Sequence, residues 1–599
     1  MEKTTFPSLL IKQAAEQGDR VTIREKDLGI WKEYTWNQYL EHVRAFSLGI
    51  KKLGLAKGDA VSILSENCPE WLFTDLGAQA AGGVSVGIYA TNSESQVEYI
   101  FNHSDSRFIV AGDQEQVDKV LAIKDNLPKL QKIIVIDMKG LRKCDDHLII
   151  SFDDLERLGQ EEERKHPDLF GEFIKDIQPD DVALLIYTSG TTGRPKGAML
   201  THWNFISQAI SWQKANPYSR DDVILSYLPL CHVLERDFSM AIHLCVGYTI
   251  NFSESIESVM ECLREISPTV FASVPRIVEK MHSGIMISID NTTLVKRWFF
   301  NFWIKVGGRL SERKMESKSW RPWHYILYVL GYLFLYRPLL DKLGLLRVRF
   351  MGAGGASVSP ELIKFFRSLG VDARELYGMT EMSGLLAVPQ GNDVIAGSVG
   401  RPPPGLKSRI AEDGELLFQG ESMFKGYYKD EKATRNIVED GWLHTGDIGK
   451  VDENGNISIV DRKKDIIITS GGKNISPSEI EDQLKCSPYI KESVIIGDRR
   501  KYVTALIQID LENVGNWAQN NRIQYTTFKS LSQQPKVTEL IQKEVDSTNK
   551  YFARVEQVKK FALLDKELDQ DDDELTATQK VRRKQISEKY SDIIEALYR

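Results

Sequence analysis

The stretch IYTSGTTGRPKGAML, residues 186–200, runs from an apolar segment into a loop of glycines, hydroxyl side chains and two cations. Glycines let backbone N–H groups approach a ligand closely, hydroxyls can donate hydrogen bonds, and a lysine supplies a point charge. We therefore expect a loop that holds phosphate groups. Its candidate ligands are Thr188, Ser189, Gly190, Thr191, Thr192, Gly193 and Lys196.

The order of residues separates this loop from the P-loop of nucleotide triphosphatases. In a P-loop the lysine follows the last glycine, and a serine or threonine that holds Mg²⁺ comes next. Here Lys196 precedes Gly197, and Ala198 stands at the position of the hydroxyl. The sequence therefore predicts phosphate binding of another kind. Taken alone, the loop could also be a turn without a ligand.

The residues before this loop alternate between strand-like and helical patterns. Residues 35–38 form a capping box that predicts a helix start. The runs DAVSIL (59–64) and VSVGIY (84–89) read as strands on either side of the helical segment 67–83. This alternation resumes from residue 181 to about 275. It predicts an α/β fold with a parallel sheet and crossover helices.

Residues 296–349 have a different composition, with 12 Lys/Arg, 3 Asp/Glu and 12 aromatic residues. They include the apolar run YILYVLGYLFLY, residues 325–336, which is too short to span a bilayer because a spanning helix needs about 20 residues. Two interpretations remain open. The run is either a buried helix with a basic outer face or an interfacial segment whose aromatics and cations meet lipid headgroups.

A domain boundary is expected near residue 461. The strand-like runs ISIV (457–460) and DIIITS (465–470) are separated by the charged DRKK, and residues 476–479 carry the signals of a helix start. We expect a large domain over 1–460, a hinge over 461–465 and a small domain over 466–599.

Composition and charge exclude some classes of protein. The chain has 599 residues, enough for several domains. Its 77 Lys+Arg against 84 Asp+Glu argue against a dedicated nucleic-acid binder. The six cysteines form no C-x-x-C pair, and the N-terminus does not read as a signal peptide. These features predict reduced thiols and a cytoplasmic protein.

Further motifs follow the phosphate loop in a fixed order. They are MGAGGASV (351–358), ELYGMTE (375–381), GWLHTGDIG (441–449), DRKKDIIITSGGKNISP (461–477) and TATQKVRRK (576–584). With YTSGTTGRPKG they resemble the AMP-forming adenylating superfamily of acyl-CoA synthetases, adenylation domains and luciferases. LPLCHVLERDF (228–238), TVFASVPRIVEK (269–280) and LYRPLLDKLGLLRVRFMGAGGA (335–356) are most similar to long-chain fatty acid–CoA ligases. The resemblance spans nearly the whole chain.

This resemblance implies a fold and a reaction. The fold would have a large N-terminal adenylating domain of layered sheets and helices and a small, mobile α+β C-terminal domain. A fatty acid carboxylate would attack the α-phosphorus of Mg·ATP to give acyl-AMP and pyrophosphate. The thiol of coenzyme A would then displace AMP. ATP, Mg²⁺ and coenzyme A are therefore expected, and nucleic acid is not.

The resemblance also implies roles for residues of the large domain. Tyr377 would lie against adenine, Thr380 would contact the α-phosphate, Glu381 would hold Mg²⁺, and Asp447 would accept the ribose hydroxyls. His232 would open the acyl pocket. The full set of nucleotide contacts outside the phosphate loop is Gly354, Gly355, Ala356, Glu375, Tyr377, Gly378, Thr380, Asp447 and Arg462.

The small domain would contribute to both half reactions. Lys580 would bridge the carboxylate and the α-phosphate, although relatives often have glycine where this chain has Gln579, and Lys584 is the runner-up. A swing about Asp461 would withdraw Lys580 and bring in Gly471, Gly472 and Lys473 to line the thiol channel.

Alternative functions are compatible with the same motifs. A medium-chain, short-chain or aryl acid ligase would use the same mechanism, and a luciferase-like oxidation remains open. A membrane-associated scaffold that binds nucleotide without hydrolysis is a different class, but unused buried charges are costly. Peripheral membrane contact through 296–349 is a further hypothesis, whereas the sequence does not indicate the oligomeric state.

Overall fold

The strands on either side of the phosphate loop belong to an eight-stranded sheet. The computed structural model describes residues 2–141, 144, 146–188, 194–316, 318–391, 393–570, 572–576 and 579–599. The strand order is β18-β9-β8-β4-β3-β5-β6-β7. In chain order the bounds are β3 Ala60–Leu64, β4 Val84–Ile88, β5 Ser106–Ala111, β6 Lys132–Val135, β7 Ile149–Ser151, β8 Val182–Thr188, β9 Lys196–Thr201 and β18 Gly426–Tyr427. From β8 to β7 all pairs are parallel, which confirms the predicted parallel sheet.

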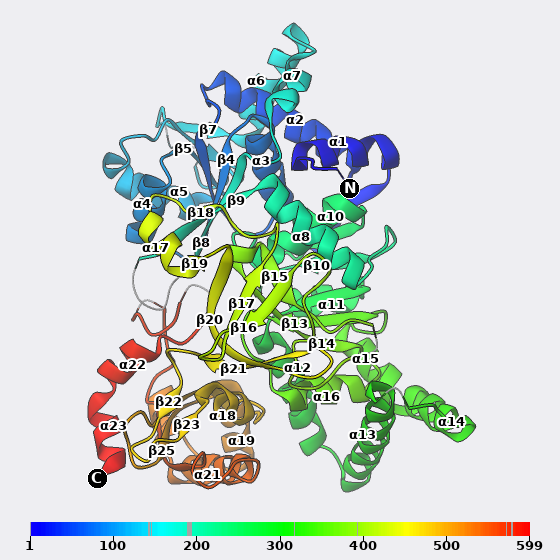
Figure 1. Ribbon diagram of the computed structural model, residues 1–599, viewed down its shortest axis with the longest axis vertical. Coiled ribbons are helices and arrows are strands. Elements are labelled where there is room, and N and C mark those ends of the chain that lie inside the picture. The colour runs from blue at the N-terminus through cyan, green and yellow to red at the C-terminus, as the bar shows by residue number, and fades with distance from the viewer. Residues whose placement is uncertain are drawn as a thin grey trace.

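Helices cover both faces of this sheet (Figure 1). Successive strand residues point to opposite faces. Val61 and Ile63 of β3 join the core under α2 (Trp36–Lys52), α3 (Pro69–Ala80) and α6 (Phe152–Lys165). Ala60 and Leu64 join the core under α4 (Glu94–His103) and α5 (Gln114–Ile123). The predicted capping box is formed, since Thr35 and Gln38 bond each other's backbone N–H groups at the start of α2.

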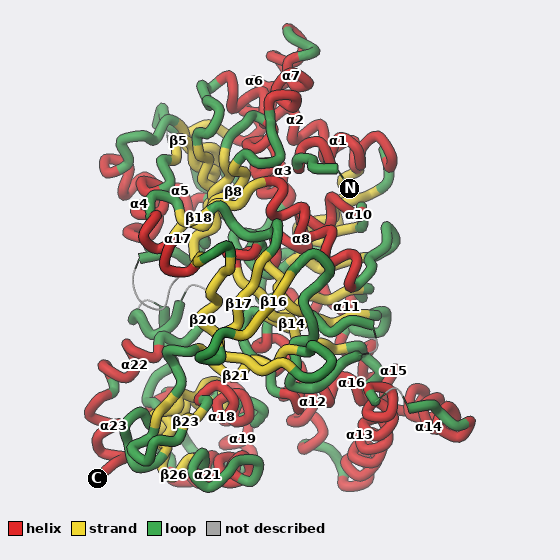
Figure 2. Tube along the Cα trace, viewed as in Figure 1, coloured by secondary structure: helices red, strands yellow, loops and turns green. Residues whose placement is uncertain are grey.

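Three more sheets complete the large N-terminal part (Figure 2). The first has the order β12-β13-β14-β15, with bounds Val270–Ser273, Phe350–Gly354, Ala373–Met379 and Gly384–Ala387. The second has the order β10-β11-β1-β2, with bounds Val223–Ser226, Thr249–Phe252, Val21–Asp27 and Ile30–Thr35. The third contains β16 Lys407–Ile410, β17 Glu415–Gln419, β19 Val438–Glu439, β20 Trp442–Val451 and β21 Ile457–Arg462.

Helices pack between and around these sheets. In chain order they are α1 Phe6–Gln17, α7 Leu169–Asp176, α8 His202–Ala215, α9 Val233–Arg236, the π-helix η2 Asp237–Ile242, α10 His243–Val246, α11 Val259–Ile266, α12 Pro275–Asp290, α13 Leu294–Met315, α14 Pro322–Gly331, the π-helix η3 Tyr332–Tyr336, α15 Arg337–Leu343, α16 Pro360–Ser368 and α17 Glu431–Ile437.

The C-terminal part is smaller and has a hydrophobic core of its own. Its sheet has the order β24-β25-β26, with bounds Ile490–Ile496, Val503–Ile509 and Val558–Leu563, and β22 (Ile467–Ile468) pairs with β23 (Asn474–Ile475). Its helices are α18 Pro477–Leu484, α19 Leu511–Asn520, α20 Phe528–Ser532, α21 Pro535–Asn549, α22 Arg583–Lys589 and α23 Ser591–Tyr598. The expected α/β architecture with a large N-terminal part and a small α+β C-terminal part is confirmed. The strand expected over 465–470 is reduced to two residues, because the chain turns at Thr469, which bonds back to Lys473.

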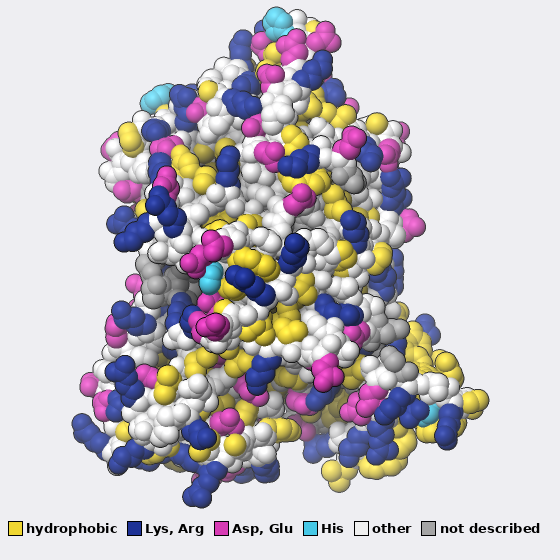
Figure 3. Space-filling view, in the orientation of Figure 1, with side chains coloured by type: hydrophobic (Ala, Val, Ile, Leu, Met, Phe, Trp, Pro, Cys, Tyr) yellow, Lys and Arg dark blue, Asp and Glu magenta, His cyan; other side chains and the backbone are white. Residues whose placement is uncertain are grey.

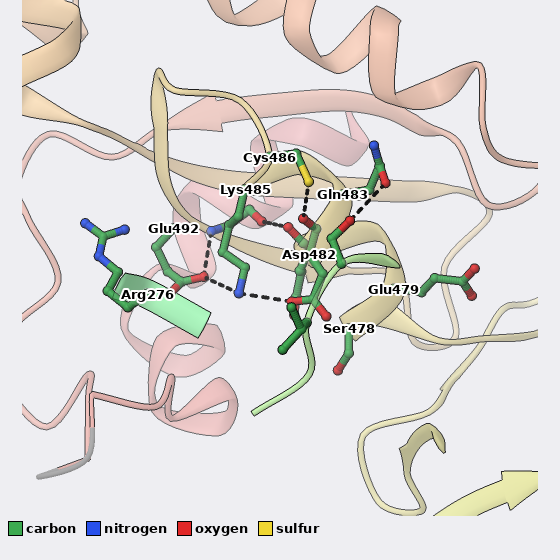
Figure 4. A network of polar contacts seen from close by, with 12 residues as sticks. Arg276, Ser478, Glu479, Asp482, Gln483, Lys485, Cys486 and Glu492 are labelled. Carbon is green, nitrogen blue, oxygen red and sulfur yellow. Dashed lines mark hydrogen bonds and ion pairs between the residues drawn. The ribbon is translucent and has the colours of Figure 1, made fainter. Parts of the chain in front are cut away.

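Helix α18 and the residues just beyond its end contact the large part through polar groups (Figure 4). Lys485, just beyond its end, pairs with Asp482 at 3.1 Å and with Glu492 at 3.9 Å. Ser359 of the large part donates to the Gln483 side chain at 3.5 Å. From α12, Arg276 donates to the Lys491 carbonyl at 3.0 Å. The contact is therefore polar, and charged groups lie within it.

Candidate active site

Three strands bring Asp447, Arg462 and Tyr377 together. Asp447 of β20 lies opposite Arg462 of β21 in the antiparallel register. The Arg462 Nε lies 2.8 Å from the Asp447 Oδ1, and the Tyr377 hydroxyl, from β14, donates to Oδ2 at 2.5 Å. Tyr377 is 70 residues before Asp447 in the chain, and Arg462 lies on the strand next to Asp447. The three side chains therefore meet because of the way the strands are arranged.

Burial and charge act in opposite directions on the Asp447 carboxyl. Desolvation raises its pKa, while the Arg462 guanidinium and the Tyr377 hydroxyl lower it. Only about 5% of Asp447 is exposed. A carboxylate held between a guanidinium and a hydroxyl presents oriented acceptor oxygens, which is what binding of a diol requires.

A second set of contacting side chains connects Lys196, at the end of the predicted phosphate loop, with Glu381 through Tyr427. The 3₁₀ turn Thr380–Met382 follows β14 and keeps Thr380 and Glu381 buried. Tyr427 of β18 donates to Glu381 Oε1 at 2.5 Å, and the Lys196 ammonium lies 5.1 Å from the centre of the Tyr427 ring. Tyr427 was not predicted from the sequence. Its only local signal is the Gly-Tyr-Tyr run at 426–428, and its partner is 46 residues away.

Lys580 reaches this site from the C-terminal part. Its side chain is solvent-exposed, yet the surrounding protein and Arg462 lower its pKa to about 8, while Asp447 and Glu381 act to raise it. Burial and then the charge of Lys580 lower the pKa of His232 to about 4. Lys580 therefore interacts electrostatically with four predicted site residues, Arg462, Asp447, Glu381 and His232. Lys584 points elsewhere, with a 70% exposed side chain 3.9 Å from Glu588.

The residue before Lys580 has an unusual backbone. Gln579 has φ +59°, in the left-handed region that favours glycine. The Lys580 N–H donates to the Thr576 hydroxyl at 3.0 Å and its carbonyl accepts from the Thr576 N–H at 2.8 Å. The turn that presents Lys580 therefore suits glycine at residue 579, and in this chain a glutamine adopts it.

The glycine motif after β13 lies beside β14. A Cβ on Gly354 would lie 2.8 Å from the Leu376 carbonyl, and Gly355 has φ +89°. Gly355 and Ala356 are exposed, and the Val358 N–H donates to Glu375 Oε1 at 3.3 Å. Desolvation raises the Glu375 pKa to about 8. At Gly378 a Cβ would lie 2.3 Å from the Gly384 carbonyl, so β14 and β15 require glycine there.

The structure only partly describes the phosphate loop. Ser189, Gly190, Thr191, Thr192 and Gly193 lie outside the described residues. Thr188 and Lys196, at the ends of β8 and β9, face each other in the antiparallel register. The described ends of β8 and β9, on either side of the predicted loop, are therefore held in antiparallel register.

Two groups of predicted residues make mainly local contacts: His232, and the turn formed by residues 471–473. His232 is the N-cap of α9, and its Nδ1 accepts from the Leu234 N–H at 3.2 Å. Gly471, Gly472 and Lys473 form an exposed turn whose described hydrogen bonds stay within residues 469–473 and Arg500. The structure does not bring this turn to Asp447.

Asp461 anchors the C-terminal part at the end of β21. It is 4% exposed, and its carboxylate accepts from the Ser476 hydroxyl at 2.7 Å and from the Ser478 N–H at 3.1 Å. It is therefore bonded to the first residues of α18. Across the part of the chain that is described, no group of three or more His, Cys, Asp or Glu side chains gathers as a metal site.

Comparison with protein families matches most of the chain. The model of AMP-binding enzymes matches residues 10–428, and that of the AMP-binding enzyme C-terminal domain matches residues 464–599. The long-chain-fatty-acid–CoA ligase FadD15 of Mycobacterium bovis is 34% identical over 604 residues, covering 100% of this chain and 97% of that protein. The long-chain-fatty-acid–CoA ligase ACSBG2 of Xenopus laevis is 31% identical, covering 99% and 84%.

Solved structures share the fold at lower identity. An anthranilate CoA ligase, AuaEII, in complex with anthranoyl-AMP matches with a TM-score of 0.72 at 19% identity, covering 99% of this chain and 97% of that one. The A-PCP didomain of a carboxylic acid reductase from Segniliparus rugosus in complex with AMP matches with a TM-score of 0.74 at 19% identity, covering 100% and 82%.

Proposed function

Because this chain belongs to the AMP-binding enzyme family, we propose that it is a long-chain fatty acid–CoA ligase. It activates a long-chain fatty acid with ATP to acyl-AMP and pyrophosphate, and then transfers the acyl group to coenzyme A with release of AMP. The observation that carries the reaction is the position of Lys580 beside the charges of Asp447, Arg462 and Glu381. Relatives that match over 97% and 84% of their own length are named long-chain ligases, which supports the substrate class.

The first half reaction is positioning plus stabilisation of phosphate charge. Tyr377 stacks on adenine, and Asp447, held by Arg462, accepts the ribose hydroxyls. Thr380 donates to the α-phosphate, and Lys196 neutralises the outer phosphates. Lys580 bridges the fatty acid carboxylate and the α-phosphate. A pKa of about 8 leaves the ammonium largely protonated at neutral pH, as this role requires.

Glu381 is the protein ligand proposed for Mg²⁺. Its carboxylate is buried and has one oxygen bonded to Tyr427, which leaves the other oxygen for a hard cation. Magnesium at phosphate sites is usually held by one or two carboxylates and by the substrate's own phosphates, which fits a site without a larger group of acidic ligands. Bound Mg²⁺ would neutralise charge on the transferred phosphates.

The second half reaction uses a second pose of the C-terminal part. The boundaries are a large domain over 1–460, a hinge over 461–465 about Asp461, and a mobile domain over 466–599. Rotation would withdraw Lys580 and bring Gly471, Gly472 and Lys473 to the thiol channel. In the present pose the described hydrogen bonds of that turn are local and none joins it to Asp447, which supports two poses.

The acyl chain and its source complete the proposal. His232 opens the acyl pocket, and its lowered pKa keeps the ring neutral beside an apolar chain. The chain acts in the cytoplasm and meets a membrane peripherally through residues 296–349. Of the helices in the described parts of the chain, none is both long and apolar enough to cross a bilayer.

Product analysis tests the function. Purified protein is incubated with Mg·ATP, coenzyme A and acids from acetate to oleate, plus benzoate, and AMP, pyrophosphate and thioester are quantified. We expect AMP and acyl-CoA that peak with long-chain acids. If AMP and thioester formation are highest with a short-chain, medium-chain or aromatic acid, the proposed mechanism stands and only the substrate class changes. Formation of ADP, or no turnover with any acid, would refute the proposal and favour the nucleotide-binding scaffold.

A further inference from the structure

Helices α13 and α14 and the π-helix η3 form an arm, residues 294–336, at the lower right of Figure 1. Its inner side is firmly packed. A Cβ on Gly307 would lie 2.1 Å from the Ser368 carbonyl of α16, and Tyr336 donates to the Trp303 carbonyl at 2.8 Å. The arm therefore has a defined position on the large part.

The outer side of the arm is apolar. Among the described residues, 11 of the 21 large hydrophobic side chains that are exposed lie between 294 and 334. On α14 and η3 they include Ile326, Val329, Leu330, Leu333 and Phe334. Residues three or four positions apart share one side of a helix, so these side chains form a continuous stripe. The buried interpretation of residues 325–336 is wrong for this stripe.

The first turns of α13 carry further exposed apolar side chains. Leu294, Val295 and Trp298 are each at least 66% exposed. Trp298 stacks on Phe302 with ring centres 5.7 Å apart. Single exposed hydrophobic residues need no explanation, but a contiguous exposed patch of this kind marks an interaction surface.

The charges of the arm identify its partner. Residues 294–336 contain eight Lys/Arg and two Asp/Glu. Figure 3 shows these basic side chains on the lower right lobe, with hydrophobic side chains along its outer margin. Tryptophan and tyrosine beside basic residues suit the headgroup level of a bilayer, and cations favour anionic lipids. A second copy of this chain would instead bring like-charged surfaces together.

We propose that the outer side of the arm docks on an anionic lipid bilayer, with the stripe from Ile326 to Phe334 and the first turns of α13 in the headgroup region. The arm lies in the interface and does not cross it, because its helices are interrupted and basic. The inference deepens the proposed function, since a bilayer is where a long-chain acid is held. Docking itself requires no catalysis.

Liposome flotation without ATP tests docking independently of the reaction. The probes are vesicles of phosphatidylcholine alone and vesicles with one third phosphatidylglycerol, at low and high salt. We expect the chain to float with the anionic vesicles at low salt and to be released by salt. The triple variant Ile326→Ser, Leu333→Ser, Phe334→Ser should lose on the order of 10-fold in bound fraction, because three apolar side chains no longer enter the lipid.

A matched control distinguishes binding through this surface from nonspecific hydrophobic adsorption to the vesicles. Ile30→Ser with Val555→Ser removes two side chains that are at least 50% exposed outside the arm, and flotation should not change. An unchanged thermal midpoint for each variant shows that it is folded. Absence of flotation with both vesicles, or flotation of the triple variant like the parent, would overturn the proposal. So would self-association that the triple variant abolishes, because a second copy would then cover the surface.

Discussion

The C-terminal part meets the large part at two places that differ in kind. At Lys580 the contact is a solvent-exposed side chain that acts on Asp447, Arg462 and Glu381 through its charge. At α18 the contact is polar, and a hydrogen bond of 3.5 Å crosses from the Ser359 hydroxyl to the Gln483 side chain (Figure 4). In the proposed mechanism, the first place carries the chemistry and the second holds the pose in which that chemistry occurs.

The charged neighbours of the lysine also differ between the two places. Desolvation and then Arg462 lower the pKa of Lys580 to about 8, while Asp447 and Glu381 offset part of this, so the lysine keeps its proton at neutral pH. At α18 carboxyls outnumber cations. Lys485 is only partly exposed and desolvation works against its charge, but Glu492 and Asp482 outweigh this and hold its pKa well above its usual range. Substitutions at the first place should change one chemical step, and substitutions at the second should change the balance between poses.

The largest effect is expected from Lys580→Ala. Loss of one preorganised charge should slow acyl-AMP formation by on the order of 10²–10³. Thioester formation from preformed acyl-AMP should be largely spared, because the proposed second pose withdraws Lys580. Single-turnover pyrophosphate release and thioester formation measure the two steps separately.

Lys584→Ala is the matched control for this prediction. It removes the same charge from a position four residues along, where the side chain is 70% exposed. Both half reactions should remain within about twofold of the parent, as for most surface substitutions. Equal losses of both half reactions in Lys580→Ala would contradict the role of this lysine.

Gly472→Trp should produce the opposite pattern. Among the described residues other than its chain neighbours, no heavy atom lies within 4 Å of a Cβ at Gly472, so the present pose accommodates a large side chain, although φ +73° strains it. In the second pose the indole would block the thiol channel, and thioester formation should fall by on the order of 10² because the reacting groups are misplaced. Gly472→Ala carries the same backbone strain without the bulk. If it is as slow as the tryptophan variant, strain and not blockage is the cause.

Ordered motifs predicted much of the fold and the position of several site residues. Tyr377, Asp447 and Arg462 are in contact, and Lys580 rather than Lys584 faces them. The parallel sheet followed from alternating apolar patterns. The catalytic and binding roles of these residues, the hinge and the domain limits stay predictions, and residues 189–193 lie outside the described chain.

Features that depend on distant pairing escaped sequence analysis. The bond from Tyr427 to Glu381 arises because β18 is the edge strand next to β9, which no local pattern indicates. The left-handed backbone of Gln579 is set by the turn closed on Thr576, not by its own preference. The exposure of the stripe at 326–334 depends on where the arm packs, since its composition is equally compatible with burial.

The carboxyls at the α18 contact give the smallest expected effect, a pH dependence. Glu279 of α12 is 8% exposed, and burial raises its pKa to about 7. Lys485 and Arg276 act to lower that pKa, whereas Glu492 and Asp482 act to raise it. When α18 leaves α12, the carboxyl enters water and its pKa returns towards the usual 4.5. The present pose therefore binds more protons, and it is destabilised as pH rises from about 5 to 7.

Glu279→Gln removes this titration, because it replaces the carboxyl with a neutral amide of nearly the same size and shape. For the parent, the ratio of acyl-AMP formation to thioester formation should fall as pH rises from 5.5 to 7.0, a range in which Lys580, with a pKa of about 8, stays largely protonated. The variant should lose this slope and form acyl-AMP about threefold faster at pH 7.0, which corresponds to less than one pKa unit. Glu361→Gln, on the exposed side of α16, should keep the parental slope. A slope that survives in Glu279→Gln would mean that another group sets the balance between the poses.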